Sequence, residues 1–290
     1  MREKKTTIRK QKASRNYTKL KLIVCGTLAL LILLAAVFAP YITPYDPYEQ
    51  DLGRALLAPC REYLLGTDWY GRDMLSRVIM GARTSVFSAV LLVLVTTVTG
   101  SIVGTVCGYH GGKPDTVLMR ISDVFLAFPG MVFAIAAASV LKGGLFGAVA
   151  ALALISWPKY ARIVRSQVMA IKNAPYIEAA RLSGSGTIKI IIKHMIPNIA
   201  GPVITTAVLD IGTMMMEIAG LSFLGLGATP PAAEWGSMMS NGRSMLQTSP
   251  WIILAPGFAI FLTVMVFNLL GDTVRDLLDP RQRKKEELPL

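Results

Sequence analysis

Two carboxylates beside a run of methionines are the residues of this chain whose types and spacing could do chemistry. Asp210 and Glu217 lie in the apolar stretch 199–221, seven residues apart, so both would face one side of a helix. An acidic side chain inside a membrane-spanning helix is costly and marks a solute pathway by default. Together with Met214, these acids would suit the passage of a cation or a metal complex. The alternatives are a position near a helix end, an ion pair with an arginine of a neighbouring chain, and ordinary packing of the methionine.

The chain lacks the residue sets that catalysis, nucleotide binding or tight metal binding would need. It has two histidines, and neither a Ser/His/Asp set nor a metalloprotease helix pattern is present. The Gly-Gly-Lys run at 111–113 lacks the upstream spacing of a phosphate-binding loop and is followed by Pro114. The three cysteines form no Cys-x-x-Cys or Cys/His cluster. We therefore expect a chain without catalytic residues, metal ligands or a bound cofactor.

The apolar residues are gathered into runs that are too long for the core elements of a soluble domain. Of the 290 residues, 53% are hydrophobic and 17% are charged, and the mean hydropathy is +0.50. A bilayer core about 30 Å thick needs roughly 20 apolar residues in a helix. The sequence therefore predicts an all-α integral membrane protein with about six transmembrane helices. The predicted segments are 22–39, 86–109, 121–141, 145–157, 199–221 and 251–271.

Glycines and prolines in these segments bear on how the helices pack. Gly100, Gly104 and Gly108 recur every four residues, which places small residues on one face and permits close approach of a neighbouring helix. Pro129 lies inside the third segment, where we expect a continuous helix because neighbouring helices can satisfy the freed carbonyl. The fourth segment is short for a span, and we expect it to continue beyond Pro158.

The basic residues are distributed unevenly between the connecting segments. If the N-terminus lies inside, the inner segments 1–21, 110–120, 158–198 and 272–290 hold 23 Lys or Arg, whereas the outer segments hold 7. Basic residues collect in the cytoplasmic loops of membrane proteins, so the pattern predicts that both termini are cytoplasmic. The formal net charge of +12 has this simpler cause, and no basic stripe interleaved with aromatics indicates a nucleic-acid partner.

The N-terminal region resembles a signal peptide, with nine Lys or Arg in residues 1–21 before an apolar run. The run is long, however, and the sequence around Pro40 is a poor cleavage site, so we expect an uncleaved first helix. The outer segments 41–85 and 222–250 are expected to be ordered, turn-rich loops. The predicted organisation is a basic cytoplasmic tail (1–21), a first transmembrane helix with its outer loop (22–85), a transmembrane domain (86–280) and a C-terminal cytoplasmic tail (281–290).

The largest inner segment, 158–198, carries a local pattern for two short helices. Pro175 suits the first turn of a helix that would extend through residues 176–183. The Gly-Ser-Gly run at 184–186 would end that helix, because glycine adopts the left-handed cap conformation cheaply. A second short helix would follow over 188–195, and Pro197 would begin the next span. The segment is therefore predicted to form a helix, a sharp turn and a helix at the cytoplasmic face.

This segment resembles the EAA loop of ABC importer permeases. The residues that carry the resemblance are Glu178, Ala179, Ala180, Arg181 and Gly184, with Pro197 thirteen residues after the glycine. His194 and Ile196 depart from the family's pattern, and they leave the helix–turn–helix prediction intact. In that family the loop is the coupling helix, which lies in a groove of a separate ATPase subunit. The resemblance implies the same role here, with Glu178 and Arg181 pairing with each other or with the partner.

Further motifs extend the resemblance over nearly the whole chain after the N-terminal tail. They are Leu65-Gly66-Thr67-Asp68 with Gly71-Arg72-Asp73, Asp123-Val124-Phe125 through Pro129, Leu221-Ser222-Phe223 through Gly227 with Trp235-Gly236, and Asn268-Leu269-Leu270-Gly271-Asp272. Together they resemble the C-type permease of the dipeptide, oligopeptide and nickel branch, with a type I importer architecture. That resemblance implies a second homologous permease, two cytoplasmic ATP-binding subunits and an extracytoplasmic solute-binding protein. ATP and Mg²⁺ would be bound by the ATPase chains, and the complex would lie in the inner or plasma membrane of a prokaryote.

The cargo is the least determined property. The stretch 206–227 and the run Glu234-Trp235-Gly236 are similar to nickel permeases, whereas the Glu-Ala-Ala-Arg stretch is equally at home in peptide permeases. We expect nickel or a metal chelate, with a dipeptide or oligopeptide as the alternative. Hypotheses from other classes are a secondary transporter or channel that needs no ATPase, which the coupling loop disfavours, and a membrane-bound enzyme, which the absent catalytic set disfavours.

Overall fold

The computed structural model describes residues 2–141 and 143–278, and this part of the chain is built of helices without a strand. The long helices are α1 (Arg2–Ile42), α2 (Met74–His110), α5 (Gly144–Ile171), α8 (Ile196–Phe223) and α10 (Trp251–Leu278). The shorter helices are α3 (Gly112–Ala127), α4 (Gly130–Val140), α6 (Pro175–Leu182), α7 (Thr187–Ile190) and α9 (Trp235–Gly242). Two 3₁₀ turns, η1 (Leu52–Arg54) and η3 (Arg243–Met245), and one π-helical turn, η2 (Ile191–Met195), complete the described elements. The predicted all-α class is confirmed, and the predicted tail 281–290 lies outside the described residues.

Five helices of the described chain are long and apolar enough to cross a membrane, and a sixth span results if α3 and α4 count as one. The prediction of about six transmembrane helices is therefore confirmed. The prediction of one continuous helix over 121–141 is wrong, because α3 and α4 are bent by 96° at their junction. Phe128 is extended, with ψ of 148°, and Pro129 stands before α4. Proline lacks an N–H and disfavours helical geometry in the residue before it, so packing with neighbours does not rescue the helix here.

Helices α2 and α5 extend well beyond the predicted segments. Helix α2 begins at Met74, where Asp73 caps it by accepting a hydrogen bond from Ser76 N at 2.7 Å. The predicted outer loop 41–85 is therefore shorter, and the proposed boundary at residues 85 and 86 falls inside α2. Helix α5 continues beyond Pro158, as predicted, and reaches Ile171. Part of the segment 158–198 is consequently a continuation of the fourth span, and the predicted outer loop 222–250 contains α9.

Helices α2 and α5 pack with their backbones in contact along the predicted glycine stripe. A Cβ added at Gly100 would lie 2.6 Å from the carbonyl oxygen of Trp157, and one at Gly104 would lie 2.4 Å from that of Ala161. At Gly108 the added atom would lie 2.8 Å from Val168 Cβ. Only glycine permits this approach, so the structure confirms the predicted close packing and identifies α5 as the neighbour.

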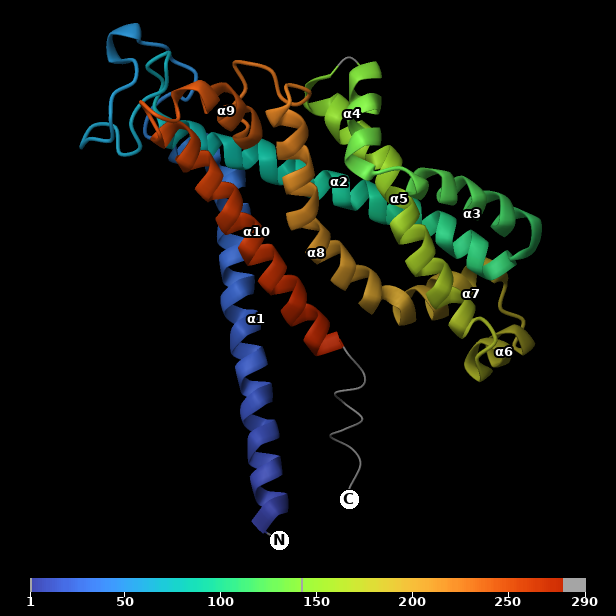
Figure 1. Ribbon diagram of the computed structural model, residues 1–290. Helices are drawn as coiled ribbons and strands as arrows, with labels where there is room; N and C mark the ends of the chain where they lie inside the picture. Colours follow the sequence, from blue (N-terminus) through green and yellow to red (C-terminus); the bar gives the residue numbers. More distant parts are fainter. Residues whose placement is uncertain (1, 142, 279–290) are drawn as a thin grey trace.

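Helix α1 contacts α2 and α10 (Figure 1). Its buried residues are all small and are Cys25, Ala29, Ala36 and Ala39. The opposite face of α1 carries large apolar side chains such as Leu30 and Leu31, which are both 55% exposed. An exposed apolar face on a long helix is suited to contact with lipid tails.

The elements gather at two opposite ends of the molecule. Figure 1 shows α9 and the segment between α1 and α2 at the upper end, and α6, α7 and the N-terminal end of α1 toward the lower end. At the upper end, Asp68 accepts a hydrogen bond from Arg72 Nε at 2.7 Å, and Arg77 Nε lies 3.6 Å from the same carboxylate. All three side chains are buried. Trp235 of α9 donates from Nε1 to the carbonyl oxygen of Val78 at 2.8 Å, which ties α9 to α2.

Candidate functional site

Helix α6, the turn after it and helix α7 have the helix–turn–helix geometry that the local sequence predicted. Pro175 occupies its first turn, where a missing N–H costs nothing. At its end, Gly184 has φ of +77° and Ser185 N donates to the carbonyl oxygen of Ala180 at 3.1 Å. This is the left-handed termination that glycine favours. Helix α7 then begins at Thr187 and continues through η2 into α8, so the second predicted short helix is joined to the following span.

One face of α6 is anchored to the protein and the other is free. Ile177 is fully buried in a small cluster with Val164, Val168 and Met195. Ala180 is half-buried and packs against the same cluster. On the outer face, Glu178 and Ala179 are exposed, and Leu182 is 90% exposed. An exposed leucine beside a small alanine is a surface onto which another protein can pack closely.

Arg181 of α6 is held by an aromatic ring rather than by an acid. Its guanidinium carbon lies 5.7 Å from the centroid of the Tyr109 ring at the end of α2, within the range of a cation–π interaction. Among the described residues no ion pair joins Arg181 to Glu178. The contact therefore connects α6 to α2, and the carboxylate of Glu178 stays available to a partner.

Asp210, the first of the two candidate acids in α8, is buried and accepts two hydrogen bonds from α5. Lys159 Nζ donates to Asp210 Oδ1 at 2.5 Å, and the Tyr160 hydroxyl donates to Asp210 Oδ2 at 2.9 Å. The Asp210 side chain is 4% exposed and that of Lys159 is 47% exposed. The ion-pair partner of Asp210 in this structure is thus a lysine of the same chain. Sequence reasoning placed Lys159 in a cytoplasmic segment, and no local signal in the sequence links it to Asp210.

The other two candidate pathway residues have different surroundings. Glu217 lies seven residues beyond Asp210 on the same helix and is half-buried. Met214 is 4% exposed, belongs to the main hydrophobic core and accepts a weak contact from Ser156 Oγ at 4.0 Å. The structure therefore brings Asp210 and Glu217 to the same helix and gives Met214 a packing environment.

Comparison with known proteins shows the family of the chain. Residues 100–284 match the family described as the inner membrane component of binding-protein-dependent transport systems. The chain belongs to this family. Residues 19–59 of the permease also match the N-terminal transmembrane domain of oligopeptide transport permease C.

Relatives of the permease cover nearly its whole length. It is 39% identical over 261 residues to the dipeptide transport system permease DppC of Haemophilus influenzae, covering 88% of each chain. It is 40% identical over 268 residues to the nickel transport system permease NikC of Escherichia coli, covering 92% of this chain and 95% of NikC. It is 40% identical over 260 residues to the glutathione transport system permease GsiD of Pectobacterium atrosepticum, covering 89% and 86%.

The fold also matches a solved transporter. The inward-facing MetNI methionine ABC transporter contains a chain with a TM-score of 0.58 and 18% identity to the permease. The match covers 71% of the permease and 98% of that chain. The permease is accordingly a multi-pass ABC importer permease, the membrane subunit class that is not itself catalytic.

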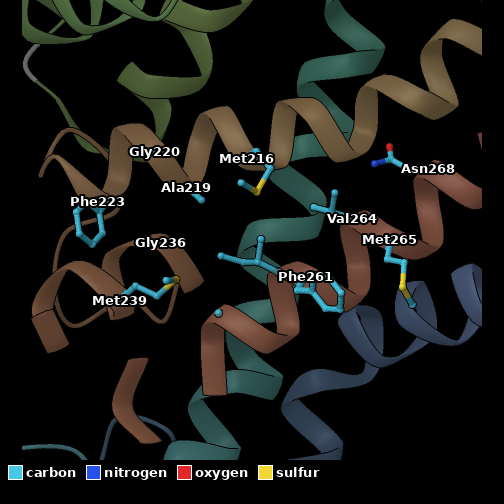
Figure 2. A pocket seen from close by; sticks show the side chains of 12 residues that line it. Met216, Ala219, Gly220, Phe223, Gly236, Met239, Phe261, Val264, Met265 and Asn268 are labelled. Carbon is cyan, nitrogen blue, oxygen red and sulfur yellow. The ribbon is translucent and has the colours of Figure 1, made fainter. Parts of the chain in front are cut away.

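An apolar cavity of about 550 Å³ lies between α8, α9 and α10 of the permease (Figure 2). Figure 2 shows Met216 and Phe223 on α8, Met239 on α9 and Phe261 on α10 among the residues that line it. Asn268 is the one lining side chain with a hydrogen-bonding amide. Such a lining suits contact with an apolar surface better than the passage of a charged solute.

Ion pairs between α3 and α5 are a further feature that sequence reasoning did not find. Arg165 donates to both oxygens of Asp115, from Nε at 2.5 Å and from a terminal nitrogen at 2.6 Å. One turn earlier on α5, Arg162 donates to Asp123. Paired guanidinium and carboxylate groups of this geometry are directional, so they fix the position of α3 against α5.

Proposed function

We propose that this chain forms half of the translocation pathway of an ATP-driven importer and couples it to a separate ATPase through residues 178–186. The observation that carries the proposal is the outward face of α6, where Glu178, Ala179 and Leu182 are exposed while Ile177 anchors the helix. A helix held on one side only can transmit the movement of a partner to the spans behind it. The cation–π contact of Arg181 with Tyr109 adds a direct connection to α2.

The partners in this proposal are a second homologous permease, two cytoplasmic ATP-binding subunits and an extracytoplasmic solute-binding protein. ATP and Mg²⁺ bind to the ATPase chains, because this sequence contains no phosphate-binding loop. Both termini are cytoplasmic, and the complex lies in the inner membrane of a bacterium. The count of 23 against 7 basic residues supports this orientation, as does the position of α6 toward the end that holds the start of α1 (Figure 1).

For the pathway, we propose the polar side of α8 that carries Asp210 and Glu217, with nickel or a metal chelate as the cargo. The identity to NikC over nearly the whole chain supports this cargo. A dipeptide or oligopeptide is the alternative, supported by the similar identity to DppC. Met214 is buried in the core, so it would reach the cargo only if α8 moved.

Purification of the native complex tests the proposal. Two ATPase chains and a second permease should co-purify with this chain. Replacement of Glu178 or Gly184 should abolish ATP-dependent uptake while membrane insertion survives. Uptake that continues in vesicles without any ATPase would instead establish the secondary transporter or channel hypothesis. Uptake of radioactive nickel against a labelled dipeptide by the whole complex decides between the two cargoes.

A further inference from the structure

The side of α5 that carries Lys159 is polar at membrane depth. Lys159 lies fifteen residues after the first residue of α5, which is about 22 Å along the helix, so a bilayer core of about 30 Å that begins at Gly144 would still enclose it. The exposed positions that follow on this face are Arg162, which is paired with Asp123 of α3, and Ser166. Charged side chains at such depth face a bundle interior or water rather than lipid. This face of α5 therefore borders a water-accessible space.

Helix α8 presents a matching polar side at the same place. Thr206 and Thr213 lie one turn to either side of Asp210, and Glu217 lies two turns from it toward α9. Thr213 is exposed, and Thr206 and Glu217 are half-buried. The hydrogen bonds from Lys159 and Tyr160 to Asp210 bring the two polar faces together. In the proposed function, the pathway would run along these two polar faces.

The group that a solute could bind there is the ammonium of Lys159 and not the carboxylate of Asp210. Both carboxylate oxygens of Asp210 accept hydrogen bonds, and its side chain is 4% exposed, so a solute meets little of this carboxylate. The ammonium group of Lys159 has three N–H donors, uses one on Asp210 and is 47% exposed. A solute at this point meets a cation with unused donors.

We propose that Lys159 binds a carboxylate of the cargo during its passage, so that the transported species is a carboxylate-bearing solute, such as a peptide or a metal–carboxylate chelate, rather than a bare divalent cation. This inference rests on the proposed function, because it assumes that α5 and α8 line the path. The protonated ammonium has no lone pair to offer a bare Ni²⁺ ion, whereas a carboxylate gains a charge-assisted hydrogen bond from it. Glu217, about 10 Å along α8 from Asp210, would meet the positive end of the same solute.

Uptake by the complete complex in proteoliposomes tests this inference with three cargoes: a labelled dipeptide, nickel citrate and aqueous Ni²⁺. The expected result is ATP-dependent uptake of at least one of the two carboxylate cargoes and none of aqueous Ni²⁺. Lys159→Gln should lower that uptake by at least about tenfold, and Lys159→Arg should retain most of it. The matched control, Lys113→Gln at an exposed position of α3, should leave uptake unchanged.

A double variant separates cargo binding from a purely structural ion pair. Lys159→Gln combined with Asp210→Asn removes both charges, so no uncompensated buried carboxylate remains and the complex should assemble. If Lys159 binds cargo, the assembled double variant stays defective in uptake. Recovery of uptake in the double variant, or efficient uptake of aqueous Ni²⁺ by the unmodified complex, would overturn the inference. Failure of the proposed function is a different result, namely uptake without ATP or a chain that co-purifies with no ATPase.

Discussion

Gly104 of α2 lies directly against the backbone of α5, since a Cβ at this position would be 2.4 Å from the carbonyl oxygen of Ala161. Real Cβ atoms do not approach a carbonyl oxygen so closely, and a backbone atom cannot rotate away as a side chain can. Tyr160, the residue before Ala161, donates to Asp210. The glycine stripe therefore sets the position of the polar face of α5 as well as the packing of two spans.

Gly104→Ala should destabilise the membrane domain, because α2 and α5 would have to separate. The expected loss is about 1–3 kcal/mol, the usual cost of overpacking. Thermal unfolding of the detergent-solubilised complex measures it. Gly26→Ala in α1 is the control, because an added Cβ there meets nothing within 4 Å. Equal unfolding temperatures for the two variants would contradict the close packing.

Two glycines in the turn after α6 should respond differently to substitution. Gly184 has φ of +77°, whereas Gly186 has φ of −67°, and neither position has an atom within 4 Å of an added Cβ. Gly184→Ala should weaken ATPase binding about five- to thirtyfold, since a left-handed conformation costs an ordinary residue about 1–2 kcal/mol. Gly186→Ala should leave ATPase binding, measured by titration of the purified subunit, unchanged. Equal binding by both variants would exclude a role for the turn conformation.

The contact between Arg181 and Tyr109 gives a graded prediction. Tyr109→Phe keeps an aromatic face beneath the guanidinium, and Tyr109→Leu removes it. In the leucine variant, the interaction that holds α6 against α2 should be weaker by about 0.5–1 kcal/mol. This loss corresponds to a roughly two- to fivefold weaker coupling of ATP hydrolysis to uptake. The measurement is the number of solutes imported per ATP hydrolysed. A phenylalanine variant as defective as the leucine variant would point to the hydroxyl group instead.

Asp68 should be required for the stability of the end of the molecule that holds α9. Its carboxylate is the shared partner of Arg72 and Arg77, and all three side chains are buried. Asp68→Asn leaves two buried guanidinium groups without their counter-charge, which should cost about 3–5 kcal/mol. Asp51→Asn is the control, because Asp51 pairs with Arg54 at an exposed site where the loss is about 0–1 kcal/mol. Chemical denaturation followed by tryptophan fluorescence checks both values.

The pair of Arg165 with Asp115 should couple α3 to α5. A double-mutant cycle with Asp115→Asn and Arg165→Gln should give an interaction energy of about 1–3 kcal/mol, the range for hydrogen bonds to charged groups. Unfolding of the four purified proteins provides the data. Additive effects of the two substitutions would show that α3 is held in place by other contacts.

Local chemistry explains what was predictable from the sequence alone. The spans follow from apolar runs of a fixed minimum length, and the turn after α6 follows from Pro175 and Gly184, which act within a few residues of themselves. The glycine stripe predicted a close helix contact because its spacing of four residues defines a face. In each case the signal and the structure it specifies lie in the same short segment.

The tertiary structure decided the features that depend on which helix lies beside which. The bend at Pro129 depended on whether groups of neighbouring helices would satisfy the freed backbone carbonyl. The sequence of the run 121–141 does not contain that information. Asp210 could be recognised as unusual in the sequence, but its partners Lys159 and Tyr160 lie about 50 residues away on another helix. Only the rotation and depth of α5 against α8 bring them together. That arrangement leaves the lysine exposed and buries the acid, because a close ion pair permits a carboxylate to be buried where an unpaired one would be too costly.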